Sequence, residues 1–209
     1  MVRQRVRIRF SKQDDLRLIG HRDLVRLLER LFRRAGLRLG MSEGFHPKPR
    51  MSFPSALAVG IEGLDEVMEL ELAESYPAET LLERLTSQAV AGLVFRSVEI
   101  LPPHARKARV RSAQYRVSIP GGHGDQVAAH TGRLLARSSC PIDRPQGRGP
   151  VDVRRSVQEL SFRDGVLTMR LSAGRGPSAG PREVLRALEL DNLEHEGGRI
   201  QRTAVELEA

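Results

Sequence analysis

The chain has 209 residues, of which 40% are hydrophobic and 29% charged, with a formal net charge of +8. This length suits one domain or two small ones with a real core, and the composition is that of a soluble globular protein. No apolar run approaches the roughly 18 residues of a membrane span, and the basic N-terminus lacks the apolar stretch of a signal peptide. The single cysteine, Cys140, excludes an internal disulfide and a zinc site built from cysteines. We therefore expect a cytoplasmic protein that does not contact membranes.

Positive charge is concentrated near the start of the chain. Residues 1–50 carry 14 cations and 5 anions, residues 51–104 carry 2 and 9, and residues 105–209 carry 18 and 12. A GC-rich genome would explain the preference for arginine over lysine, but it would not segregate charge in this way. The distribution favours a basic functional face and a polyanionic partner, with ordinary solvated surface as the alternative.

The first half of the chain predicts the order β-α-β-β-α-β. Arginine alternates with Val6, Ile8 and Phe10, which predicts a strand over 5–10 with one basic face. Leucines at helical spacing predict a helix over 21–36, with arginine at most of the remaining positions. A second helix is predicted over 77–90, and strands are predicted over 37–39, 54–63, 66–74 and 93–100, with a turn at Gly63.

The second half repeats this outline. We predict strands over 114–119 and 199–208, helices over 124–138 and 181–190, and a hairpin over 156–172 that turns at Asp164–Gly165. The helix over 124–138 is expected to bury Val127, Ala128, Leu134 and Leu135. The fold prediction is therefore α+β, with two tandem ferredoxin-like units over 1–103 and 113–209. The linker is predicted over 104–112, within the proline-marked, cationic segment 101–112.

The segment "SEGFHPKPR" over 42–50 is the best candidate for a binding site. Its prolines restrict the backbone, so Lys48 and Arg50 would be held outward for contact with phosphates. Phe45 and His46 would be placed to stack on an unpaired base. The alternative is that Phe45 fills the core and the prolines only end a strand.

Two further surfaces carry segregated charge. The polar stripe of the helix over 21–36 would follow a phosphate backbone, and a solvated helix face is the equally consistent alternative. The stripe consists of Arg22, Arg26, Arg30, Arg33 and Arg34. Arg5, Arg7 and Arg9 would extend this patch if their strand face is open. Glu69 and Glu71 would form an acidic strand face that docks a basic partner.

His21 and His46 are the candidates for general acid–base chemistry, in which an imidazole would activate a ribose 2′-hydroxyl. The alternative is that His21 and Asp23 cap the helix. His21, Asp23 and His46 have none of the tight spacing of metal ligands, so we expect no metal and no cofactor.

The order of these segments resembles a bacterial family associated with radical SAM enzymes, a domain of unknown function that occurs alone or fused behind a radical SAM domain. The resemblance rests on His21 and Asp23 at the helix start, "RRAGL" at its end, "SEGFHPKPR", "VGIEG", and the later "RVSIP", "VDVRR", "PREVLRAL" and "RT". It implies a small cytoplasmic protein without an iron–sulfur cluster of its own. The layout is also similar, at the level of fold only, to CRISPR repeat-processing endoribonucleases.

Three functions remain open from the sequence. The first is an RNA-binding accessory protein that presents structured RNA, such as ribosomal or transfer RNA, to a separately encoded radical SAM protein. The second is a metal-independent endoribonuclease that uses His21 or His46. The third is a protein–protein adaptor with no RNA role.

Overall fold

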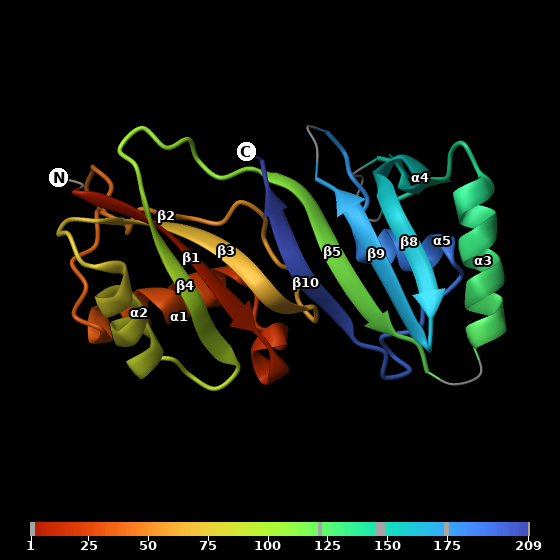
Figure 1. Ribbon diagram of the computed structural model, residues 1–209, viewed down its shortest axis with the longest axis horizontal. Coiled ribbons are helices and arrows are strands. Elements are labelled where there is room, and N and C mark those ends of the chain that lie inside the picture. Colours follow the sequence, from red (N-terminus) through yellow and green to blue (C-terminus); the bar gives the residue numbers. More distant parts are fainter. Residues whose placement is uncertain (1–2, 121–122, 145–148, 174–175, 209) are drawn as a thin grey trace. The chain divides into compact units, whose positions relative to one another are not determined.

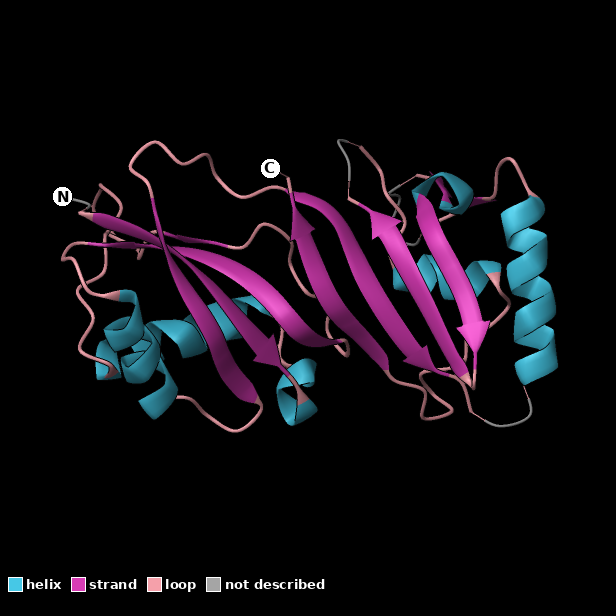
Figure 2. Ribbon diagram, viewed as in Figure 1, coloured by secondary structure: helices cyan, strands magenta, loops and turns pink. Residues whose placement is uncertain are grey.

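The chain divides into two compact units, residues 1–109 and 110–209, in a computed structural model that describes residues 3–120, 123–144, 149–173 and 176–208. The division between Arg109 and Val110 falls inside the segment expected to be the linker. Both units combine helices with antiparallel strands (Figures 1 and 2), which confirms the α+β class. Within the described ranges, no helix combines the length and the apolar content needed to cross a membrane.

The first unit places its strands in the order β4-β1-β3, with β2 paired to β3, and every pair is antiparallel. Its elements are β1 (Gln4–Lys12), the 3-10 helix η1 (Asp14–Leu18), α1 (His21–Arg34), β2 (Met51–Ser52), β3 (Glu62–Leu72), α2 (Ala78–Ser87) and β4 (Leu93–Leu101).

Alternation along the strands and helical spacing in α1 place one apolar core between the sheet and the two helices. In β1 the buried apolar side chains are Val6, Ile8 and Phe10, as the sequence predicted, and Ser11 and Lys12 at its end are buried as well. The residues of α1 that pack on them are Leu24, Leu28, Leu31 and Phe32. Because the apolar positions of α1 face the sheet, its arginines lie on the outer surface of the unit.

The strand predicted over 54–63 is wrong. The strand before β3 is the two-residue β2, in which Met51 pairs with Leu70, and 54–61 is a loop. Gly60 has a φ of 89° and its N–H donates to the carbonyl of Arg17, which holds this loop against η1. Over 37–39 only an isolated bridge forms, between Leu39 and Leu72. The small apolar residues of this segment match a strand pattern, but the chain turns before it can pair with a neighbouring strand.

The second unit places its strands in the order β10-β5-β9-β8, again antiparallel. The hairpin turns at Asp164 and Gly165, whose φ values of 50° and 72° fit a type I′ turn and confirm the prediction. A small sheet of β6 and β7 precedes the hairpin. The elements are β5 (Val110–Ser118), α3 (Gly124–Ala136), β6 (Pro141–Ile142), β7 (Val151–Asp152), α4 (Val153–Ser156), β8 (Val157–Arg163), β9 (Val166–Ser172), α5 (Pro181–Ala187) and β10 (Ile200–Leu207).

The buried face of α3 differs from the predicted one. Ala128 and Leu135 are exposed. The buried positions are Val127, His130, Thr131 and Leu134. His130 can be buried because its Nδ1 lies 2.7 Å from the carbonyl oxygen of Leu188 and donates to it. The prediction from apolar residues alone therefore placed the buried face wrongly, because two of the four buried positions of α3 are polar, His130 and Thr131.

Candidate functional site

A groove of about 1010 Å³ lies in the first unit, between α1 and the segment 37–49. One set of lining residues is cationic, namely Arg22, Arg26, Arg33, Arg38 and Lys48. The other set is apolar and includes Val25, Leu37, Leu39, Met41, Pro47 and Pro49. His21 and Glu29 also line it. The groove thus combines a rim of net positive charge, five cations against one carboxylate, with an apolar wall.

The arginines of α1 reach the groove because they recur on one side of the helix. Arg22, Arg26 and Arg33 are exposed and lie beside the buried leucine face. Arg26 approaches Asp23 at 3.5 Å, but both side chains are more than 60% exposed, so this pair is weak. Among the described residues, Arg22 and Arg33 have no ion-pair partner, and Glu29 does not pair with Arg33 as its spacing allows. These cations are therefore available to a ligand.

The opposite side of the groove is a short hairpin held by backbone hydrogen bonds. The N–H of Ser42 donates to the carbonyl of Lys48 at 2.8 Å, and the N–H of Lys48 donates to Oγ of Ser42 at 2.9 Å. Met41 and Pro49 form a bridge beneath them. Phe45 at the tip is fully exposed, so the alternative in which it fills the core is wrong. The hairpin is stiff because of these bonds as well as its prolines.

The groove gathers only some of the residues singled out from the sequence. Arg30 does not line it, and neither do the exposed Phe45 and His46. Arg34 donates to the side chain and the carbonyl of Gln88, which ties the end of α1 to the segment after α2. Arg50 lies outside the groove and pairs with Glu71 at 3.4 Å.

One groove cation, Arg38, was missed by sequence reasoning. It lies in the segment that was expected to form a strand, where alternation gave no reason to single it out. Its side chain is 77% exposed, and its Nε lies 3.9 Å from a carboxylate oxygen of Glu74. At that distance the pair constrains Arg38 little.

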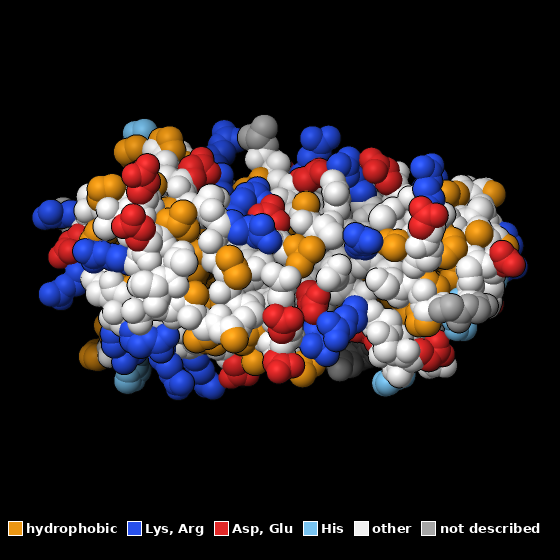
Figure 3. Space-filling view, turned by 60° about the horizontal axis from the view of Figure 1, so that its bottom comes forward, with side chains coloured by type: hydrophobic (Ala, Val, Ile, Leu, Met, Phe, Trp, Pro, Cys, Tyr) orange, Lys and Arg blue, Asp and Glu red, His pale blue; other side chains and the backbone are white. Residues whose placement is uncertain are grey.

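The surface around α1 is part of a wider positive region. In Figure 3, Lys and Arg side chains gather at the lower left, in the part of the view that holds the first unit. This agrees with the excess of cations in residues 1–50. A region of one sign attracts polyanions from a distance, and salt weakens that attraction.

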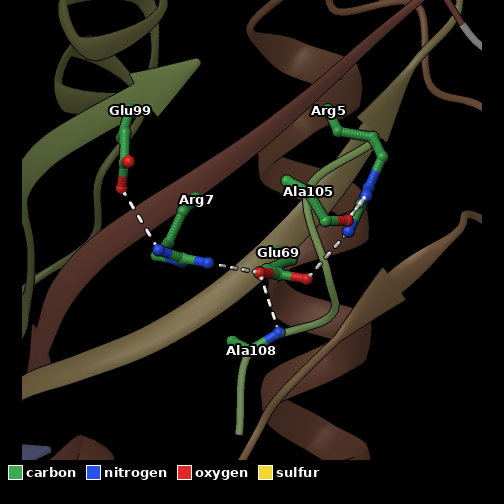
Figure 4. Close-up of polar contacts among 6 residues, drawn as sticks. All are labelled: Arg5, Arg7, Glu69, Glu99, Ala105 and Ala108. Carbon is green, nitrogen blue, oxygen red and sulfur yellow. Dashed lines mark hydrogen bonds and ion pairs between the residues drawn. The ribbon is translucent and has the colours of Figure 1, made fainter. Parts of the chain in front are cut away.

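The arginines of β1 do not belong to this region, and the expectation that they extend it is wrong. Figure 4 shows Glu69 between Arg5 and Arg7, at 3.3 Å and 3.0 Å from their guanidinium nitrogens. Arg7 also pairs with Glu99 at 3.4 Å, and Arg9 pairs with Asp65. In the strand register Arg7 lies opposite Glu69 of β3 and Glu99 of β4, and Arg5 lies opposite Glu71. Arg9 lies opposite Val67 and Ser97 and pairs with Asp65 instead, so each of the three arginines has a carboxylate partner.

The expected acidic docking face is not formed either. Glu69 is only 5% exposed and also accepts a hydrogen bond from the N–H of Ala108 at 3.1 Å. Arg5 donates to the carbonyl of Ala105 at 2.6 Å, so the segment that follows β4 is fixed to the same sheet face (Figure 4). Glu71 is paired with Arg50. This side of the first unit is therefore occupied by internal contacts.

The histidines do not assemble an acid–base pair in the groove. His21 lines it and meets the ring of Phe53 edge-on, with 5.0 Å between ring centroids. Gly20, and not His21 or Asp23, is the N-cap of α1, and no side chain caps it. In the described part of the chain, no three His, Cys, Asp or Glu side chains are grouped so that they could hold a metal ion. The arrangement supports binding of anionic and apolar groups more directly than it supports cleavage.

Comparison with known proteins gives a family and distant structural likenesses, among them two crystal structures. No curated protein matches the chain. A crystal structure of an unknown protein from Galdieria sulphuraria is 13% identical over 99% of both chains, with a TM-score of 0.32. A structure titled "putative glycine cleavage system transcriptional repressor" is 12% identical over 94% of this chain and 95% of that one, with a TM-score of 0.29. The family described as "Uncharacterized protein conserved in bacteria (DUF2344)" matches residues 5–181, and the chain belongs to that family.

Proposed function

We propose that this protein binds RNA through the groove between α1 and the hairpin over 41–49. The observation that carries the proposal is the set of cations in that groove. Among the described residues, Arg22, Arg33 and Lys48 form no ion pair, whereas every arginine of β1 is paired with a carboxylate. A cation without an internal partner keeps its full attraction for a phosphate, and arginine can contact a phosphate through two N–H groups at once.

The order of strands in the sheet also favours the α1 groove over the open sheet face as the RNA-binding surface. We infer that each unit is a ferredoxin-like fold, because its strands follow the order fourth, first, third, second. RNA-binding proteins of this fold commonly read bases on the open sheet face with aromatic side chains. Here that face of the first unit carries the Arg5–Glu69–Arg7 cluster and the bound segment around Ala105 and Ala108. The α1 groove is the more accessible cationic surface.

The proposed role is that of an accessory protein. The family resemblance implies an association with radical SAM enzymes, whose cluster needs three closely spaced cysteines, and this sequence has one. We propose that a separately encoded radical SAM protein acts on ribosomal or transfer RNA that this protein holds. The protein would then supply affinity and position, and its partner would supply the chemistry.

The test is a binding measurement on charge-reversed variants. Total bacterial RNA is titrated with the wild type, with Arg26→Glu/Arg33→Glu, and with Arg30→Glu/Arg96→Glu. Both variants change the net charge equally, and each affects exposed positions. We expect the groove pair to weaken binding by roughly tenfold more than the control pair. Equal losses would mean that only overall charge matters, and no binding by the wild type would overturn the proposal.

A further inference from the structure

Resting on the proposed function, we infer that the groove takes an unpaired segment of RNA, such as a loop or a single-stranded run, and not a duplex. The cationic rim alone would suit either form of RNA, because both expose phosphates. The apolar wall distinguishes them. Double-stranded RNA presents phosphates and 2′-hydroxyls to a protein, whereas unpaired nucleotides also present the faces of their bases.

The apolar side chains of the groove are accessible and not merely part of the core. Met41 is 45% exposed and lies on one leg of the hairpin, while Pro47 and Pro49 lie on the other. Leu39 and Val25 are partly buried and continue this wall toward α1. A base that enters the groove would cover this surface and remove it from water, which a paired base cannot do.

The size of the groove also fits separate bases. Its volume of about 1010 Å³ is close to the upper end of the cavities, roughly 300–1,000 Å³, that enclose small ligands. The groove cations of α1, Arg22, Arg26 and Arg33, span about 16 Å along the helix at about 1.5 Å per residue, and Glu29 lies between the last two on the same wall. A short extended strand can therefore lay its phosphates along this row with its bases directed at the wall.

Phe45 supplies a stacking surface at the tip of the same hairpin. Its ring is fully exposed, and the hydrogen bonds between Ser42 and Lys48 hold the residues that flank it. Stacking on an aromatic ring tolerates any base, since every base has a π face. Removing such a ring typically weakens binding by about tenfold or more. An exposed phenylalanine that contributes nothing to the core is well placed for this role.

The experiment compares three RNA probes with the full chain at about 150 mM salt. The probes are an unstructured uridine oligomer, a hairpin with a uridine loop, and a blunt duplex of equal length. We expect the first two to bind at least about tenfold more tightly than the duplex. Phe45→Ala should weaken binding of these two by about tenfold and leave duplex binding unchanged, while Val94→Ala, at an exposed aliphatic residue of β4, should change neither.

The outcomes separate this inference from the function on which it rests. Equal affinity for the duplex and the single strand, with both lost in Arg26→Glu/Arg33→Glu, would overturn the inference and leave RNA binding intact. Failure of all three probes and of total RNA to bind would overturn both. Because Phe45 is fully exposed, its replacement does not threaten the fold, and thermal unfolding of the variant checks this directly.

Discussion

Glu69 holds two of the three arginines of β1. It lies on β3 opposite Arg7 in the strand register, is nearly buried, and accepts hydrogen bonds from Arg5, Arg7 and the N–H of Ala108. The arginines of α1 have no acidic strand beside them, and their charge remains exposed. Glu69 thus makes Arg5 and Arg7 structural, whereas the exposed arginines of α1 can contact a ligand.

Replacing this carboxylate should be costly. Glu69→Gln removes the charge that compensates two partly buried guanidinium groups, so the free energy of unfolding should fall by about 3 kcal/mol. Urea unfolding measures the loss. Glu99→Gln is the control, because Glu99 also pairs with Arg7 but its side chain is 61% exposed, and it should cost less than about 1 kcal/mol. Equal losses would show that burial of the pair does not matter.

The second unit carries two carboxylates that should make its stability sensitive to acid. The N–H of Cys140 and the hydroxyl of Ser139 lower the pKa of Asp152, and the hydroxyl of Ser112 and the amide of Gln114 lower the pKa of Glu206. A carboxylate whose pKa is lowered by folding stabilises the folded state above its unfolded pKa, and this contribution disappears as the pH falls through the folded pKa.

The expected result is a loss of stability in acid that depends on these two groups. The urea midpoint of the wild type should fall from about pH 5 downward. Asp152→Asn/Glu206→Gln should be less stable than the wild type at about pH 7, and the gap should close near pH 2. If the difference in stability between the wild type and the double variant did not change with pH, the hydrogen bonds would not depend on the ionised carboxylates, which would contradict this account.

At the scale of elements, α1 shows what sequence can and cannot predict. Its buried face follows from leucine spacing, and both the helix and its arginine stripe were predicted. The groove was not, because its second wall is a loop segment whose path depends on single hydrogen bonds, such as that from the N–H of Arg50 to the carbonyl of Gly40. Periodicity carries no information on such contacts, so Arg38 was missed and Arg50 was grouped with the wrong surface.

Replacing two glycines by alanine should change the free energy of unfolding in opposite directions. Gly92, before β4, has a φ of 80°, and a Cβ there would lie 2.5 Å from the carbonyl oxygen of Gln13. Gly92→Ala should therefore lower the free energy of unfolding by about 2 kcal/mol or more. Gly132 lies within α3 with no atom within 4 Å of a Cβ, so Gly132→Ala should stabilise by about 0.5–1 kcal/mol. Chemical denaturation measures both changes. A stabilised Gly92→Ala variant and a destabilised Gly132→Ala variant would contradict this account.

At the scale of the whole molecule, the pairing of opposite charges decides which cations of the first unit stay exposed. Each unit has the same order of strands, but the acidic residues 51–104 neutralise β1 and leave the groove of the first unit positive. The outline of two α+β units was predictable because hydrophobic periodicity repeats along the chain. Which charges remain free was not predictable, because it depends on strand register and on the path of the segment after β4.

Salt dependence should report the number of groove cations that contact phosphates. Five cations line the groove, and for single-stranded nucleic acid each contact contributes about −0.7 to the slope of log affinity against log salt concentration. The wild type should approach a slope of about −3.5, and Arg26→Glu/Arg33→Glu should give a clearly shallower one. A slope near zero would mean that ion release does not drive binding.

The central claim is tested most directly by crosslinking in bacterial cells, followed by sequencing of the RNA attached to the protein. The wild type is compared with Arg26→Glu/Arg33→Glu and with Arg30→Glu/Arg96→Glu. We predict that one defined class of RNA is enriched with the wild type and with the control pair, and that it is lost with the groove pair. Enrichment of no RNA with the wild type, or of the same RNA with the groove pair, would contradict RNA binding through this groove.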